Sequence, residues 1–116
     1  MPVAWLSLDE SDNDIARFFS YLITALQGIN QEIGVELQSI LEIGSDPPIE
    51  NLLVALVNDI NASETRFALI LDDYHLIQDI KIHQALDFLF DHFPPGMHMV
   101  IISRTIPPMP LGRLRV

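Results

Sequence analysis

Two adjacent carboxylates, Asp72 and Asp73, follow directly after the short apolar run at residues 67–71. An apolar run without polar alternation is typical of a strand buried on both faces, as in a parallel sheet covered by helices. The acids would then lie at the carboxyl end of that strand, where open α/β sheets bind their ligands. Carboxylate and water oxygens are the ligands that Mg²⁺ prefers. One acid could therefore hold Mg²⁺ through water while the other orients or deprotonates an attacking water. A helix cap or a solvated turn is the alternative.

A cation follows the next apolar run, residues 99–102, which ends at Ser103 and Arg104. The planar guanidinium of Arg104 matches phosphate oxygens, so we expect it to contact a γ-phosphate rather than serve as a surface arginine. His75 follows the acids and is a candidate ligand contact, although a role in a turn or helix start is favoured. Acids and an arginine at neighbouring strand ends indicate a nucleoside-triphosphate site. Nothing in the chain matches G-x-x-x-x-G-K-[ST], the loop that cradles phosphates.

Composition restricts the partners of the chain. With 116 residues it is one domain at most, and its net charge of −10 with only six Lys and Arg argues against nucleic-acid binding. No apolar stretch approaches the roughly 18 residues of a membrane span. The N-terminus lacks the basic region of a signal peptide. The absence of cysteine excludes disulfides and suits an intracellular chain, so we expect a cytoplasmic location.

Strands and helices are predicted to alternate along the chain, which is typical of a parallel α/β sheet. Strands are expected at 3–8, 67–72 and 98–103. Apolar residues at helical spacing predict a helix from Ile15 to Leu26 that begins at Asp12 or Asn13 and ends at Gly28. Further helices are predicted around 33–41, 49–60 and 82–93.

Other polar residues have simpler interpretations. Asp9 and Glu10 end the first strand and are interpreted as a solvent-exposed acidic turn rather than a catalytic pair. His83 falls on an i, i+4 stripe with three aspartates, which indicates a solvated helix face. The H-x-x-x-H spacing that a helical metal site would need is absent.

The order of the motifs resembles a known family. The segments are Trp-x-Ser-Leu-Asp-Glu-x-Asp-Asn-Asp (5–14), Arg-Phe-x-x-Tyr-Leu (17–22), Leu-Asp-Asp-Tyr-His-Leu-Ile (71–77), Ile-His-x-Ala-Leu (82–86) and Ile-Ser-Arg-Thr-x-Pro-Pro (102–108). Together they resemble the ATPase module of MalT-like transcription activators, which are LuxR-type regulators of the STAND class of P-loop NTPases.

The resemblance implies a partial P-loop NTPase core of about three strands, within a three-layer parallel sheet with flanking helices. It implies that Asp72 and Asp73 are the Walker B acids, with Asp72 holding the metal and Asp73 the attacking water, and that Arg104 is the sensor 1 arginine. ATP and Mg²⁺ are the implied cofactors of a parent protein. In such a parent, ATP and an inducer drive self-association, and a separate helix-turn-helix domain activates transcription.

The chain also departs from the family pattern, because the family's Walker A strand, loop and helix should precede Met1. Residues 1–116 are therefore interpreted as part of an NTPase domain, taken from a longer protein. Triphosphate affinity in P-loop proteins rests chiefly on the backbone N–H groups and lysine of that loop. We expect no tightly bound cofactor and no ATPase activity from this chain alone.

The missing strand also leads to an expectation about assembly. By the family's sheet order, the strand at 98–103 would lie at an open edge, so we expect a homodimer through Met99–Ile102. Two alternatives remain: an interaction module with inert acids, and a receiver-like signalling domain. The receiver reading needs a third aspartate and a lysine after later strands, but the next strand ends in Ser-Arg and the only lysine is Lys81.

Overall fold

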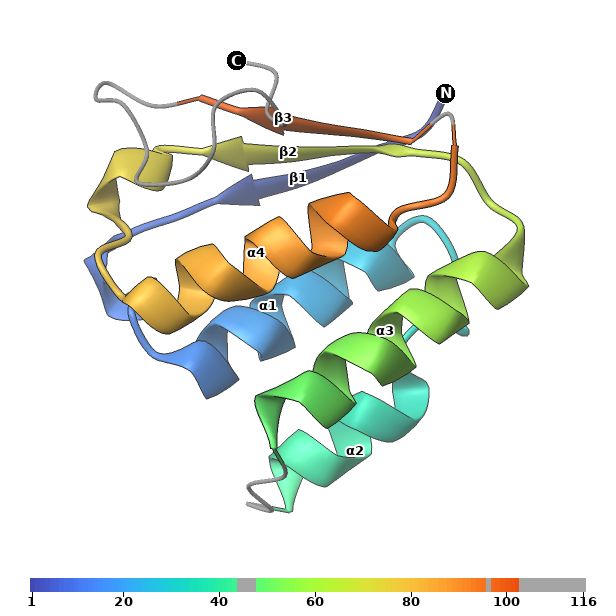
Figure 1. The fold of residues 1–116 in the computed structure, drawn as a ribbon, viewed down its shortest axis with the longest axis horizontal. Coiled ribbons are helices and arrows are strands. Elements are labelled where there is room, and N and C mark those ends of the chain that lie inside the picture. Colours follow the sequence, from blue (N-terminus) through green and yellow to red (C-terminus); the bar gives the residue numbers. More distant parts are fainter. Residues whose placement is uncertain (44–47, 96, 103–116) are drawn as a thin grey trace.

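The computed structural model of the protein describes residues 1–43, 48–95 and 97–102. Three strands, four α-helices and two 3₁₀ turns alternate along the described chain (Figure 1). In chain order they are β1 (Val3–Ser7), η1 (Glu10–Asp12), α1 (Ile15–Gln27), α2 (Val35–Glu42), α3 (Ile49–Ser63), β2 (Ala68–Asp72), η2 (Tyr74–Leu76), α4 (Ile80–His92) and β3 (His98–Ile101).

The three strands form one parallel sheet in the order β1-β2-β3, which confirms the predicted α/β class. In register, Val3 pairs with Ala68 and Ser7 with Asp72, while Leu71 pairs with Ile101. The central strand is therefore β2, and its last residue is the first of the two acids. Among the described residues, no strand pairs with the outer edge of β3.

The helices pack in layers on one face of the sheet. Figure 1 shows α1 and α4 beside each other beneath the sheet, and α2 and α3 farther from it. The burial of β1 and β2 alternates accordingly: Leu69 and Leu71 are buried, whereas Ala68 and Ile70 are only half-buried. The expectation that residues 67–71 are buried on both faces is thus wrong for the described chain, because no described helix covers the second face.

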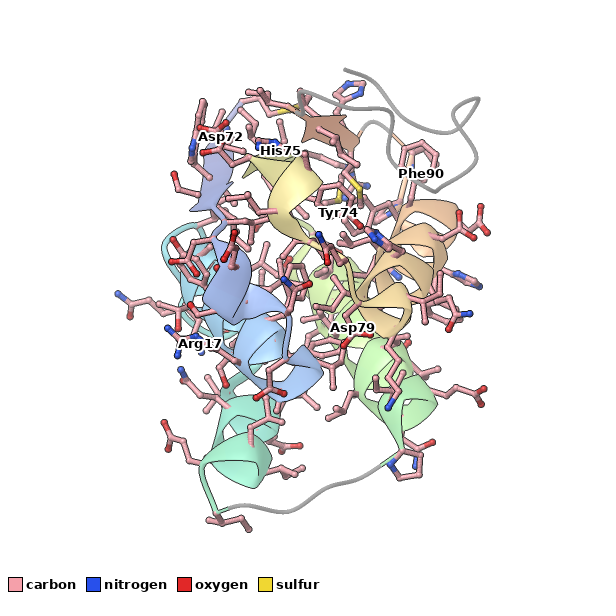
Figure 2. The ribbon with its side chains drawn as sticks, turned by 90° about the vertical axis from the view of Figure 1, so that its left-hand side faces the viewer. Arg17, Asp72, Tyr74, His75, Asp79 and Phe90 are labelled. Carbon is pink, nitrogen blue, oxygen red and sulfur yellow. The ribbon has the colours of Figure 1, made fainter. Side chains whose placement is uncertain are left out.

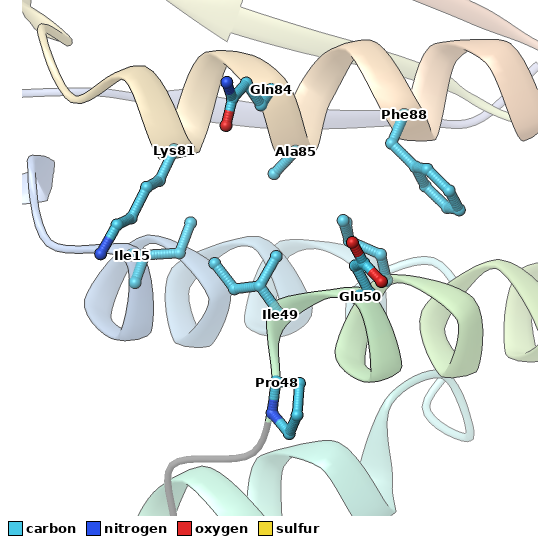
Figure 3. Close-up of a pocket in the computed structure, with 9 residues that line it drawn as sticks. Ile15, Pro48, Ile49, Glu50, Lys81, Gln84, Ala85 and Phe88 are labelled. Carbon is cyan, nitrogen blue, oxygen red and sulfur yellow. The ribbon is translucent and has the colours of Figure 1, made fainter.

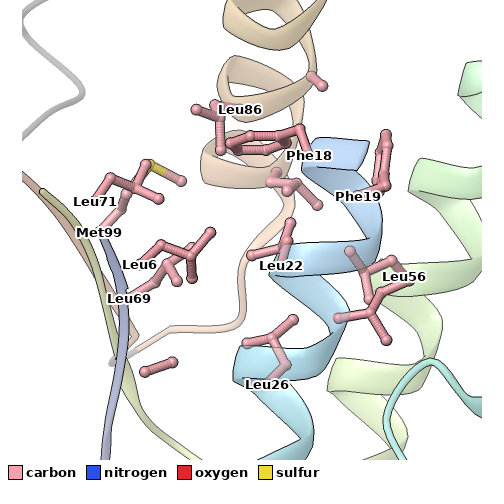
Figure 4. Packing of buried hydrophobic residues seen from close by; sticks show 14 of the residues in the cluster. Leu6, Phe18, Phe19, Leu22, Leu26, Leu56, Leu69, Leu71, Leu86 and Met99 are labelled. Atoms are coloured by element: carbon pink, nitrogen blue, oxygen red, sulfur yellow. The ribbon is translucent and has the colours of Figure 1, made fainter. Parts of the chain in front are cut away.

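The core lies between the sheet and α1, and continues from α1 to α3 (Figure 4). The predicted apolar face of α1 is confirmed, since its buried residues are Phe18, Phe19, Leu22, Ile23 and Leu26. Leu6, Leu69 and Met99 from the three strands point toward this face, and Leu56 of α3 lies near it on the other side. Burying large apolar side chains on two sides of α1 is the main source of stability in such a layered domain.

The start of α1 differs from the prediction. Asp14, rather than Asp12 or Asn13, caps the helix, and its carboxylate accepts a hydrogen bond from the Ala16 N–H at 3.2 Å. Asp12 is instead buried within η1, where its carboxylate accepts a hydrogen bond from the Asp9 N–H at 2.9 Å. Gly28 ends α1 as predicted.

One glycine is required by its surroundings. Gly34 precedes α2 with φ +73°, in the left-handed region that side chains disfavour. A Cβ built there would lie 2.8 Å from Cγ2 of Ile23 in α1. The Gly34 N–H also donates to the Asp59 carboxylate of α3 at 2.9 Å, so this turn joins three helices.

In the described part of the chain, no helix combines the length and the apolar character needed to cross a membrane. The second predicted helix, around 33–41, is observed as α2, which ends at Glu42.

Candidate functional site

The acid pair lies at the carboxyl end of the central strand, as the sequence predicts. Asp72 is the last residue of β2 and pairs in register with Ser7 of β1, and Asp73 is the first residue of the turn that follows. Both side chains are half-buried. In an open parallel sheet this is the edge at which ligands bind.

The backbone of Asp73 has a rare conformation. Its φ of +59° and ψ of +36° are left-handed, and apart from Glu64 it is the only non-glycine residue with positive φ in the described chain. Aspartate tolerates this conformation better than most residues, but it remains less favourable than an ordinary helical or extended backbone. Such outliers are most common in tight turns and at functional sites.

Backbone hydrogen bonds hold the acid turn to both neighbouring strands. The Leu8 N–H donates to the Asp72 carbonyl at 3.0 Å on the β1 side. On the β3 side, the Ile102 N–H donates to the Leu71 carbonyl at 2.9 Å, and the Tyr74 N–H donates to the Ile102 carbonyl at 3.1 Å. The turn is therefore fixed relative to the ends of all three strands.

Arg104, the predicted phosphate contact, lies outside the described residues together with Ser103. The last described residue is Ile102, whose backbone is bonded to Leu71 and Tyr74 beside the acid turn. The chain thus reaches the acid turn two residues before Arg104, and the role of Arg104 stays a prediction.

His75 belongs to η2, in agreement with its predicted position in a turn. Figure 2 shows its label beside that of Asp72 near the end of the strands, whereas Tyr74 lies on the side of η2 that faces α4. His75 is half-buried and thus open to solvent on one side. Its contact with a ligand stays a prediction.

Asn13 holds the far end of the loop between β2 and α4. Its Nδ2 donates to the carbonyls of Leu76 at 2.9 Å and Glu10 at 3.1 Å. Its Oδ1 accepts from the Gln78 N–H and, at 3.0 Å, from the Asp79 N–H. Because these loop residues lie more than 60 positions away, the sequence suggested only a helix cap for Asn13.

His83 is not on a solvated face, so that prediction is wrong. It is 3% exposed, and its Nδ1 is hydrogen-bonded to the hydroxyl of Tyr74, which is 1% exposed. The reason is that η2 turns the Tyr74 ring inward against α4 and covers this part of the helix. Burial lowers the pKa of His83, although a hydrogen bond with the Ile77 backbone and the charge of Asp79 oppose this. Burial raises the pKa of the Tyr74 hydroxyl.

The acidic turn after β1 is solvent-exposed, as expected for Asp9 and Glu10. Asp9 caps η1, and hydrogen bonds from the side chain and backbone of Ser11 lower the pKa of its carboxyl group. The buried Asp12 forms an ion pair with Arg17, with 3.6 Å between Oδ1 and Nε. These contacts are local to the turn and α1, so they fit a structural role.

Among the described residues, no group of three or more His, Cys, Asp or Glu side chains lies close enough together to hold a metal ion. A magnesium site of the nucleotide type does not need such a group. Mg²⁺ usually keeps several waters and is bound by one or two carboxylates plus the substrate phosphates. Asp72 and Asp73 fit this second kind of site by their chemistry and place in the sheet.

A hollow of about 600 Å³ opens where α1, α3 and α4 begin (Figure 3). Its walls are mainly apolar, with Ile15, Ile49 and Phe88 among them, while Lys81 and Glu50 add opposite charges. Neither Asp72 nor Asp73 lines it. The hollow is therefore separate from the acid turn.

No family model matches the chain. Comparison with individual known proteins does find relatives. The chain is 36% identical over 114 residues to the HTH-type transcriptional regulator MalT of Serratia proteamaculans, covering 98% of this chain and 13% of that protein. It is 32% identical, with the same coverage, to MalT of Vibrio cholerae. It is also 30% identical over 98% of its length to 10% of the serine/threonine-protein kinase PknK of Mycobacterium tuberculosis. Nearly the whole chain is thus similar to a small segment of much longer proteins.

Proposed function

We propose that this chain is part of the nucleotide-binding domain of a MalT-like transcriptional regulator. The observation that carries the proposal is the acid pair at the carboxyl end of the central strand of a parallel sheet. The similarity to MalT regulators over 98% of the chain supports the same reading. Because the chain spans only 13% of those relatives, the activity and partners of the whole protein remain part of the proposal.

In this function the two acids have different tasks. Asp72, at the end of β2, would hold Mg²⁺ through water, and the bound ion would supply positive charge against the phosphates of ATP. Asp73 orients or deprotonates the water that attacks the γ-phosphate. Arg104 contacts the γ-phosphate as the sensor 1 residue, which the bonding of Ile102 beside the acid turn supports.

Residues 1–116 contain these parts but no G-x-x-x-x-G-K-[ST] loop. We therefore expect the isolated chain to bind ATP more weakly than about 1 mM, which corresponds to less than about 4 kcal/mol. No ATP hydrolysis should be measurable. Tight binding of Mg·ATP to the purified chain in calorimetry would contradict this dependence on a separate phosphate loop.

The decisive experiment uses the natural gene product that contains this chain. We expect a G-x-x-x-x-G-K-[ST] loop upstream of residue 1 and Mg²⁺-dependent ATP binding by the whole protein. Asp72→Ala should abolish hydrolysis because it removes the anchor of the metal, and Asp73→Asn should slow hydrolysis more than it weakens binding. Glu42→Ala, an exposed carboxylate at the end of α2, is the matched control. Mild and equal effects of both aspartate changes would instead favour inert acids.

A second candidate function, an interaction module, is favoured by the surface of the sheet. Val3 and Trp5 on the uncovered face are each 51% exposed, and Ile102 beyond β3 is 42% exposed. The outer edge of β3 has no partner strand in the described chain. An unpaired edge of this kind can pair with a strand of another chain.

We therefore expect the isolated chain to form a homodimer through the edge at Met99–Ile102. Light scattering at tens of micromolar should give twice the mass of 13.1 kDa. Val100→Lys, in the middle of β3, should shift the mass to that of a monomer. Val54→Lys, on the exposed side of α3, should not. A monomeric mass for the folded wild-type chain would refute the dimer.

A further inference from the structure

The loop between β2 and α4 contains a buried tyrosine directly after the acid pair. Tyr74 follows Asp73, is 1% exposed, and points toward α4 rather than toward the edge of the sheet (Figure 2). Its hydroxyl is hydrogen-bonded to Nδ1 of His83 in α4. The two rings also meet edge to face, with centroids 5.1 Å apart and an angle of 74° between their planes.

The chemistry of the two side chains suits this hydrogen bond. The phenolic O–H of Tyr74 is a donor that can point at the imidazole nitrogen. Burial lowers the pKa of His83, so its ring stays neutral near pH 7 and can offer an unprotonated Nδ1 as acceptor. The contact is thus a neutral, directional hydrogen bond in a dry environment, where it is stronger than at a surface.

The hydrogen bond restricts the backbone next to it. Tyr74 and Asp73 share a planar peptide, so fixing the tyrosine side chain against α4 limits the conformations open to Asp73. Asp73 has the left-handed φ of +59°, which a free turn would rarely populate. The Asp73 carbonyl also accepts from the Leu76 N–H at 3.1 Å, and the Tyr74 carbonyl from the Ile77 N–H at 3.0 Å, which closes the short helix η2.

We propose that Tyr74 and His83 are positioning residues: their hydrogen bond holds Asp73 in its left-handed conformation and keeps its carboxylate at the ligand edge of the sheet. The proposal rests on the function proposed above for Asp73. Packing alone does not account for the hydroxyl of Tyr74, because a phenylalanine ring would fill the same space as the tyrosine ring.

The test measures amide hydrogen exchange of the 116-residue chain by NMR. In Tyr74→Phe, exchange at Leu76 and Ile77 should become roughly three- to tenfold faster, since one net hydrogen bond is lost next to them. The amide of Ile33, which donates to Asn30 in a distant turn, should change less than twofold. The matched control is Tyr21→Phe, which removes the hydroxyl of a 37% exposed tyrosine and should change neither region.

The histidine provides a second, independent variant. His83→Asn places an amide oxygen near the position of Nδ1 and should keep part of the protection at Leu76 and Ile77, whereas His83→Leu should lose it. The proposal is overturned if Tyr74→Phe matches Tyr21→Phe, or if exchange rises by the same factor at Ile33 as at Leu76. If Tyr74→Phe does not fold, the comparison of the two His83 variants decides the question in the same way.

The consequence for activity separates this inference from the proposed function. In the whole protein, Tyr74→Phe should lower kcat for ATP several-fold with little change in KM, because it misplaces the water-orienting acid without removing the metal anchor. Unchanged kcat in Tyr74→Phe, with Asp73→Asn defective, would overturn the positioning role alone. If the wild-type protein hydrolyses no ATP, the proposed function fails. The exchange measurement then still tests whether the hydrogen bond between Tyr74 and His83 restricts the backbone of the acid turn.

Discussion

Asn13 should contribute to stability because its side chain joins the turn before α1 to the loop between β2 and α4. It makes four hydrogen bonds, to the backbone of Glu10, Leu76, Gln78 and Asp79. Each net hydrogen bond contributes about 0.5–1.5 kcal/mol, and the low end applies here because the side chain is only half-buried and water can replace part of the set. Asn13→Ala should therefore lower the free energy of unfolding by about 2 kcal/mol. For a chain of 116 residues this corresponds to a fall in Tm of roughly 8 °C.

Urea unfolding followed by circular dichroism measures this change, provided that the slope m is the same in both proteins. Asn58→Ala is the matched control, because Asn58 is exposed on α3 and alanine is the better helix former. The reasoning is refuted if Asn13→Ala lowers the free energy of unfolding by less than about 0.5 kcal/mol, which is the size of an ordinary surface substitution.

Two further predictions concern the turn before α2 and the buried histidine. Gly34→Ala should destabilise the chain by about 1–3 kcal/mol in urea unfolding, because φ is +73° and the new Cβ meets Ile23. Gly28→Ala, where the backbone is right-handed, should change stability by less than about 1 kcal/mol, and equal effects would contradict the argument. For His83, burial lowers the folded pKa below the usual 6.5, so the unfolded state binds more protons below that pH. The free energy of unfolding should then fall as pH drops below about 6.5, by at most about 1.4 kcal/mol per pH unit from this group. Denaturation curves between pH 7 and 5 should show a shallower fall in His83→Asn, and a parallel fall would contradict this assignment.

Local patterns were sufficient to predict the strands and α-helices of this fold. The apolar runs at β1, β2 and β3 are short, and the spacing from Ile15 to Leu26 fits one helix face. The acid pair could be placed at the ligand edge because parallel strands end on the same side. An apolar run does not reveal whether both faces are covered, since that depends on which helices lie on the second face of the sheet. Ile70 points to the face that no described helix covers, and it is therefore only half-buried.

The contacts that hold the acid turn could not be predicted from local patterns. They join residues that are distant in sequence, or residues whose neighbours indicate a different role. In the sequence Asn13 is one of several possible capping residues in an acidic turn, yet three of its hydrogen-bond partners, Leu76, Gln78 and Asp79, lie more than 60 positions away. His83 lies among aspartates at helical spacing, which is typical of a solvated face. Only the inward turn of Tyr74 after a left-handed Asp73 covers it, and no local pattern encodes that turn.

The way the acid turn is held has a consequence for signalling by the proposed domain. Backbone hydrogen bonds tie it to the ends of β1 and β3, and side chains tie the same loop to α1 through Asn13 and to α4 through His83. A ligand that displaces Asp73 would strain the contact between the Tyr74 ring and His83 in the first turns of α4. Because α4 packs against α3, a movement of α4 would reach the layer of helices farthest from the sheet. The same contacts that position the acid in the free chain thus offer a physical route by which the state of the nucleotide could alter a distant surface.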